Sequence, residues 1–181
     1  MAPSTPDPDL ASALCLSCGL CCDGTLFCKV PVVRGDNVIA LEARGLTIVP
    51  DGEESVFHQP CPCLHDKKCG IYLERPTVCR GFACKLLAGF QAGALPFDDA
   101  RAHIEKFFAL KAAVWAELER VAPELLSVPP LSLPKRLEEL SGGENQLMFR
   151  RQYGKILLLL WALNNHLTQH FRDEPPDEKA A

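Results

Sequence analysis

The sequence predicts an α+β protein in which a small cysteine-rich region of short strands and loops packs on two or three longer helices. Two observations lead to this prediction. All ten cysteines of the 181-residue chain lie between Cys15 and Cys84, and residues 85–181 contain none. The cysteine-free half carries apolar residues at three- and four-residue spacing, which is the pattern of amphipathic helices.

The length of the chain suits one domain built from two intimate parts. We expect a disordered tail over residues 1–11, a cysteine-cluster region over 12–90, a helical region over 91–171 and a second disordered tail over 172–181. Both tails are rich in proline and acidic residues and poor in large apolar ones, a composition that does not support a packed core.

Short extended segments are expected at residues 30–33, 46–49 and 55–58. Between the first two, Asp36 is placed to cap a brief helix over residues 38–42. Gly45 is placed to close this helix in the left-handed conformation that glycine tolerates best. Pro76 fits the first turn of another short helix, which carries Cys79.

The helical half begins where Asp98 can cap a long helix. Its apolar stripe comprises Ile104, Phe107, Phe108, Trp115, Leu118 and Ala122. A last helix is expected from about residue 144 to residue 171. The run 156–161 in its middle is apolar on all sides, which predicts burial all round. Trp115 and Trp161 should therefore both be shielded from water.

The net charge, the apolar runs and the first residues of the chain limit the partners and the compartment that we expect for this protein. The net charge of −4 offers no electrostatic footprint for nucleic acid. The longest apolar run covers residues 156–163, far short of the roughly 20 residues that span a bilayer. Residues 1–9 lack the basic and apolar parts of a secretory signal. We therefore expect a cytoplasmic protein with no nucleic-acid or membrane partner, and the protein partner stays open.

Thiols of a cytoplasmic protein stay reduced, so the cysteines are better explained as metal ligands than as disulfides. The first cluster comprises Cys15, Cys18, Cys21 and Cys22, and the second comprises Cys61, Cys63, Cys69, Cys79 and Cys84. Two-residue gaps between the first three cysteines occur in bacterial iron–sulfur sites, whereas zinc sites more often use separate C-x-x-C pairs. The spacing favours an iron–sulfur cluster of the four-iron type and leaves zinc as the alternative.

The number of centres is open at this point. Cys21 and Cys22 are adjacent, so their side chains diverge and could serve two centres. Eight ligands would complete two four-sulfur sites. Five or fewer would complete one site and leave reactive thiols.

The order of the motifs adds to this interpretation. Cys15-x-x-Cys18-Gly19-x-Cys21-Cys22 is followed by Cys61-Pro62-x-Leu64 and by Cys69-x-Ile71-Tyr72-x-x-Arg75-Pro76-x-x-Cys79-Arg80-x-Phe82-x-Cys84. In this order the motifs resemble the CxxCxxCC cysteine-cluster family, to which zinc or iron chelation is ascribed. The resemblance implies eight metal ligands, which are Cys15, Cys18, Cys21, Cys22, Cys61, Cys69, Cys79 and Cys84. Cys28 and Cys63 fall outside the pattern, and we expect neither to be a primary ligand.

Three functions follow as hypotheses. The first is metal binding by an iron–sulfur cluster or zinc, with a redox, sensing or chelating role. The second is an enzyme of unknown reaction at the cluster, either methyl transfer or redox; the family includes a flagellin lysine N-methylase branch, but that branch has additional sequence. The third is a protein-interaction module that zinc holds together. The sequence identifies no catalytic residue.

Histidines and arginines carry weaker signals. His166 and His170 lie four residues apart on one helix face, the spacing of a two-histidine metal site, but they stand near the end of the helix. His65 is the histidine that could join the cysteine cluster, whereas His58 and His103 carry no signal.

Arg75 and Arg80 flank the turn that carries Cys79. They could donate hydrogen bonds to sulfurs or bind an anionic substrate. We interpret them instead as residues that hold this loop to backbone carbonyls or to an acidic side chain.

Overall fold

A computed structural model describes residues 8–128, 132–140 and 146–172, and it confirms the α+β fold. Its helices are α1 (Pro8–Cys18), α2 (Val38–Ala43), α3 (Thr77–Gly81), α4 (Lys85–Gln91), α5 (Phe97–Val121), α6 (Leu133–Leu140) and α7 (Gln146–His170). Its strands are β1 (Lys29–Val32), β2 (Ile48–Asp51), β3 (Glu54–His58), β4 (Leu64–His65) and β5 (Lys68–Cys69). No helix within the described ranges is long and apolar enough to cross a membrane.

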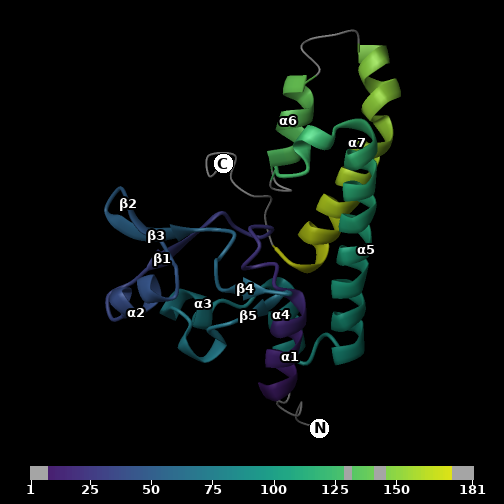
Figure 1. The fold of residues 1–181 in the computed structure, drawn as a ribbon. Coiled ribbons are helices and arrows are strands. Elements are labelled where there is room, and N and C mark those ends of the chain that lie inside the picture. Colours follow the sequence, from purple (N-terminus) through teal and green to yellow (C-terminus); the bar gives the residue numbers. More distant parts are fainter. Residues whose placement is uncertain (1–7, 129–131, 141–145, 173–181) are drawn as a thin grey trace.

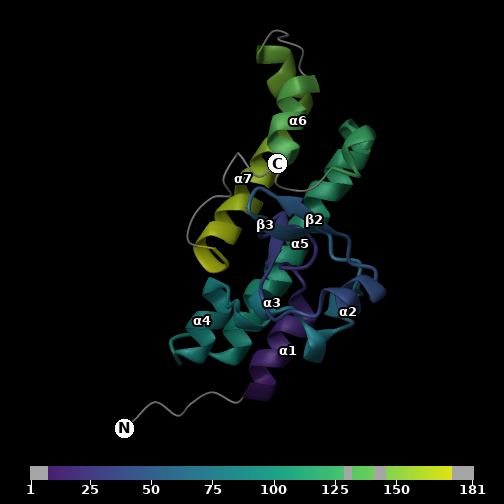
Figure 2. The ribbon, with the colours of Figure 1, turned by 90° about the vertical axis from the view of Figure 1, so that its left-hand side faces the viewer.

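The strands form two small antiparallel sheets on one side of the long helices (Figure 1). One sheet has the order β1-β3-β2, and the other is the β4-β5 hairpin. Figure 1 shows that α1 and α4 lie near the lower end of α5 and that α7 crosses α5, and Figure 2 shows α5 and α7 running side by side from the perpendicular direction. The cysteine-rich region thus lies against one end of the helical region.

The main core lies between α5 and α7. Helix α5 contributes Phe107, Val114 and Leu118, and α7 contributes Ile156 and Leu163, all of which are buried. The core extends to α1 and α4, so the helices and the first cysteine block share one apolar interior. The apolar stripe predicted for α5 is buried in this core or packs against it.

The prediction that residues 156–161 are buried on all sides is wrong. Ile156 is fully buried, but Leu158 is 70% exposed and Trp161 is 68% exposed. Consecutive residues of a helix point around its whole circumference, and α5 and α6 cover only part of the circumference of α7. The expectation that both tryptophans are shielded therefore fails at Trp161, whereas Trp115 is partly buried.

The N-terminal cap of α2 differs from the prediction. Asn37, not Asp36, caps α2, and its Oδ1 accepts a hydrogen bond from the Ala40 amide (3.0 Å). Asp36 instead accepts hydrogen bonds from the Thr77 amide (2.8 Å) and hydroxyl (2.7 Å), which ties the α2 loop to α3. Gly45 does close α2, with a φ of 90°. Asn37 caps α2, whereas the carboxylate of Asp36 is hydrogen-bonded to Thr77.

The expected disordered tails cover residues 1–11 and 172–181. Residues 8–11 form the start of α1, because Leu14 farther along this helix is buried in the main core and holds it in place. Residues 1–7 and 173–181 lie outside the described residues, as does residue 144, the expected start of the last helix.

A buried carboxylate joins the two long helices. Glu117 on α5 is 3% exposed and pairs with Arg120 on the same helix and with Lys155 on α7 (2.7 Å). Hydrogen bonds from Arg120 and then Lys155 lower the pKa of Glu117 to about 2. A buried carboxylate is tolerated only when it is paired in this way.

We predict that Ile156→Ala lowers the free energy of unfolding by about 2–5 kcal/mol, because it opens a cavity in the main core. Leu158→Ala removes a similar side chain from an exposed position and should change stability by less than about 0.5 kcal/mol. Urea unfolding of both variants measures the difference. Equal losses would show that the exposed face of α7 is covered in solution.

The ion pairs of Glu117 predict a pH-dependent contribution to stability. The pKa of Glu117 in the folded protein, about 2, lies below the ordinary value of 4.5, so the contribution is present above pH 4.5 and is lost as the pH falls toward 2. Glu117→Gln should be less stable than the wild type at neutral pH, and the two should converge in acid. Chemical denaturation across this range measures it, and a constant difference would contradict the charged state of Glu117.

Candidate metal centre

The first cysteine block is built by α1 and the turn that follows it. Cys15 and Cys18 lie three residues apart and so share one face of α1. Gly19 then leaves the helix with a φ of 69°, and its carbonyl accepts a hydrogen bond from the Cys22 amide (2.9 Å). This turn brings Cys21 and Cys22 back toward the helix face that carries the other two thiols.

The second block is spread over three elements. Cys69 ends β5, Cys79 lies on α3, and Cys84 precedes the first residue of α4. The Cys61 amide donates a hydrogen bond to the Cys22 carbonyl (2.8 Å), so the two blocks are joined directly by backbone. Residues 39 positions apart in the sequence are thereby neighbours.

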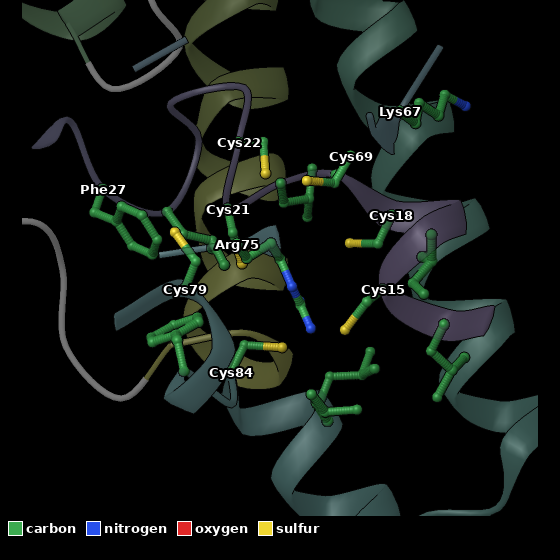
Figure 3. A pocket seen from close by; sticks show the side chains of 18 of the residues that line it. Cys15, Cys18, Cys21, Cys22, Phe27, Lys67, Cys69, Arg75, Cys79 and Cys84 are labelled. Carbon is green, nitrogen blue, oxygen red and sulfur yellow. The ribbon is translucent and has the colours of Figure 1, made fainter. Parts of the chain in front are cut away.

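Seven of the eight predicted ligands surround one cavity of about 80 Å³ (Figure 3). They are Cys15, Cys18, Cys21, Cys22, Cys69, Cys79 and Cys84. The rest of the wall is mainly apolar and includes Leu14, Leu20 and Phe27, with Arg75 and Lys67 as its charged residues. The two cysteine blocks therefore meet around a single space.

Cys61, the eighth predicted ligand, does not line this cavity. It is buried with Cys63 in a second apolar cluster beside the three-stranded sheet, and the two thiols hydrogen-bond to each other. The Cys63 thiol also donates to the carbonyl of Arg44 (3.5 Å). Cys28 and His65 are absent from the cavity lining as well.

A comparison with protein-family models decides the family. The model described as "CxxCxxCC: Putative zinc- or iron-chelating domain" matches residues 14–104, just over half of the 181 residues. The chain belongs to the CxxCxxCC family. Membership indicates a zinc- or iron-chelating function. No curated protein and no solved structure matches the chain.

The CxxCxxCC match covers both cysteine blocks and ends in the second turn of α5. Helices α6 and α7 lie beyond it. The family region therefore includes the whole cavity, whose last lining residue in the sequence is Ile104. The helices that follow supply part of the main core and lie outside the matched residues.

One set of thiols in the family region is strongly desolvated. Burial raises the pKa of Cys15, Cys18, Cys21 and Cys84, in the case of Cys18 to about 12. Repulsion from Cys84 adds to the rise in the pKa of each of the other three. These four form thiol set one, and at neutral pH they stay protonated unless a cation replaces the protons.

A second set centres on a thiol pair. The Cys22 thiol points toward Cys69 (Figure 3), and a hydrogen bond between them lowers the pKa of Cys69 to about 6 and raises that of Cys22. Cys61 and Cys79 interact electrostatically with members of this pair, and their pKa values rise to about 11, mainly through burial. We call Cys22, Cys61, Cys69 and Cys79 thiol set two.

Arg75 brings a positive charge to both sets. Its guanidinium reaches between Cys15 and Cys84 in Figure 3, and its charge favours the thiolates of Cys15, Cys69 and Cys79. Its Nε–H donates to the Tyr72 carbonyl (2.8 Å), and the guanidinium stacks on the Tyr72 ring. Arg75 thus holds the loop by a backbone carbonyl, as interpreted from sequence, and also acts on the thiols.

Arg80 behaves differently from Arg75. It lies at the exposed end of α3 and donates to the Thr77 hydroxyl (3.3 Å). It does not line the cavity. The sequence offered no signal to separate these two arginines, because which of them reaches the thiols depends on how the loop before α3 folds back on the site.

The Gly19 turn yields a prediction. A Cβ at position 19 would lie 2.8 Å from the Lys67 carbonyl oxygen, whereas a Cβ at Gly52, which also has a positive φ, meets nothing within 4 Å. In both alanine variants, a residue with a Cβ must adopt the left-handed backbone conformation, which destabilises the protein by about 1–2 kcal/mol. In Gly19→Ala the free energy of unfolding should fall by about 1–3 kcal/mol more, because the added methyl group overpacks the turn. This variant should also bind less metal.

Thermal melting and elemental analysis of the Gly19→Ala and Gly52→Ala proteins measure this difference. If the two variants are equally stable and hold equal metal, the close approach of Gly19 to the β4-β5 hairpin does not position the site.

Proposed function

We propose that the protein binds iron–sulfur clusters through two four-thiolate sets and serves a redox or sensing role. The observation that carries the proposal is the convergence of seven thiols on one apolar-walled cavity. Thiolates are soft donors that suit iron–sulfur clusters and zinc, so the donor set fits the metals ascribed to the family.

The assignment of ligands follows the electrostatic neighbours. Set one takes Cys15, Cys18, Cys21 and Cys84, and set two takes Cys22, Cys61, Cys69 and Cys79. Adjacent Cys21 and Cys22 then serve different centres, which removes the conflict between their diverging side chains. All eight cysteines of the family pattern are used, and Cys28 and Cys63 remain outside.

The spacing of the sulfurs supports a cluster over a single ion. Four sulfurs bound to one zinc ion at about 2.3 Å lie about 4 Å apart. Among the described residues, the group of metal-type ligands whose donor atoms lie within 4.8 Å of one another consists of histidines and includes no cysteine. Thiolates that each bind a different iron atom of one cluster are spaced more widely, which suits this arrangement.

The surrounding residues would support such a role. An iron–sulfur cluster supplies one-electron transfer when bound, with a potential that depends on net charge and solvent exposure. The apolar wall limits contact with water, and Arg75 offsets negative charge on the thiolates. All ten cysteines are free thiols, which is consistent with a reducing compartment, and we place the protein in the cytoplasm.

The test is anaerobic purification without chelators, followed by analysis of iron, zinc and acid-labile sulfide and by visible spectroscopy. We expect iron and sulfide in the wild type. Cys84→Ser and Cys69→Ser should each lose about half of the metal, because each removes one of four ligands from one centre. Cys28→Ser, outside both sets, is the matched control and should keep all of it.

Three outcomes would overturn parts of the proposal. A folded, metal-free protein with ten titratable thiols would exclude metal binding. Zinc without iron would replace the redox role with a structural one, because zinc does not change oxidation state. A loss in Cys63→Ser equal to that in Cys61→Ser would show that Cys63 belongs to set two.

A second candidate function is a zinc-stabilised interaction module. The observation that favours it is the exposure of Leu158 (70%) and Trp161 (68%), which lie three residues apart on α7. Exposed large apolar side chains on one helix face are typical of protein-binding surfaces. The metal analysis separates the two candidates, since this one requires zinc.

A further inference from the structure

Three histidines form a second cluster of metal-type ligands away from the thiols. They are His103 on α5 and His166 and His170 on α7, and one ring nitrogen from each lies within 4.8 Å of the others. His166 and His170 share a face because they are one helical turn apart. The third member comes from the other long helix, which explains why the sequence carried no signal at His103.

The rings are held closely. The His103 and His170 rings stack with centroids 3.7 Å apart, and the His166 and His170 centroids lie 4.7 Å apart. His166 is buried, and its Nε2 lies 2.9 Å from the carbonyl oxygen of His103. Because a carbonyl only accepts, Nε2 carries the proton and Nδ1 of the neutral ring keeps its lone pair.

This hydrogen bond is of the kind that orients metal-binding histidines. Such a ligand commonly donates its second ring N–H to a backbone carbonyl, which fixes the tautomer and the ring position. Burial lowers the pKa of His166 and, in His170, lowers it to about 4. Both rings are therefore neutral at pH 7, the form that binds a metal.

We propose that His103, His166 and His170 bind a divalent cation of the zinc type, separately from the thiol sets. Three imidazoles with a fourth position open to solvent form a known zinc geometry. His103 and His170 are partly exposed, so water or another ligand can reach that position. Zinc–nitrogen bonds of about 2.1 Å need nitrogens about 3.4 Å apart, so nitrogens that lie within 4.8 Å of one another approach by up to about 1.4 Å. The stacked rings of His103 and His170 also rotate, so that both in-plane lone pairs point at one ion.

Two lysines near His170 influence which fourth ligand a metal at the histidine site would take. Lys106 and Lys85 lie near enough to contribute to the lowered pKa of His170. Their positive charge opposes a bare cation and favours an anion in the fourth position. A metal here would therefore bind with a negatively charged partner ligand, such as chloride or a small carboxylate.

The site is distinct from the cavity between the cysteine blocks. None of the three histidines lines that cavity. The family match ends at residue 104, so His166 and His170 lie outside the family region. The histidine site thus lies in the helical part of the chain. Whether it binds a metal does not depend on which thiolates bind metal in the cavity.

The test is a Zn²⁺ titration of the protein as purified, with its thiols already saturated by metal, in chloride buffer. Long-range ¹H–¹⁵N spectra of the imidazoles report which histidines respond. We expect one further equivalent of Zn²⁺ to shift the resonances of His103, His166 and His170 together, while those of His58 and His65 stay in place.

The matched variants are His170→Gln, His103→Gln and the control His58→Gln. Calorimetry should show the affinity for the added Zn²⁺ reduced by about 100-fold or more in the first two, since even loss of an outer-shell partner costs about 10–100-fold. The control should match the wild type, and the thiol-bound metal should be unchanged in all. Both cluster variants replace partly exposed rings, and melting curves verify that they fold.

Two results would overturn the proposal. One is a titration in which no histidine resonances move as a set of three. The other is equal Zn²⁺ affinity in His170→Gln and His58→Gln. In either case the three rings pack as neutral aromatic groups at the α5-α7 crossing and bind no metal. A failure here would leave the absorption and metal content of the thiol sets unaffected, so the two sites are judged separately.

Discussion

The close backbone approach between Gly19 and Lys67 is the constraint on which the metal region depends. It lets the turn after α1 lie against the β4-β5 hairpin, with room for no Cβ at position 19. The amide of Cys61 then reaches the carbonyl of Cys22. Without this approach the two cysteine blocks would face each other across a gap filled by a side chain, and the thiols could not share a cavity.

Helix α5 contacts both the turn that carries Cys21 and Cys22 and the β4-β5 hairpin. Lys111 on α5 pairs with Asp23 in the cysteine turn (2.8 Å), and Lys67 of the hairpin lies over the Phe108 ring of the same helix. Ile104 of α5 forms part of the cavity wall itself. The helical half therefore positions both cysteine blocks, although it contributes no cysteine to them.

Burial of so many thiols also sets the chemistry of the region. The apolar wall raises the pKa of most of these cysteines, which disfavours thiolates until a metal replaces the protons. Arg75 offsets this effect with one positive charge inside the cavity. The balance makes metal binding dependent on pH, with affinity rising as the pH rises.

The cysteine region, the two long helices and the family could all be predicted from the amino-acid sequence. Clustered cysteines and apolar residues spaced three or four apart are patterns of residues that are close in sequence. Such patterns can be recognised before the tertiary structure is known. The sequence also supplied eight predicted ligands, seven of which line the cavity.

Which residues come together across the chain depends on the packing of elements that are distant in sequence. This packing separated Cys61 from the cavity, distinguished Arg75 from Arg80, brought His103 to His170 and left Trp161 exposed. Each of these outcomes depends on contacts between elements far apart in sequence. An apolar helix face is buried only where another element covers it, and periodicity within one helix does not reveal where that element lies.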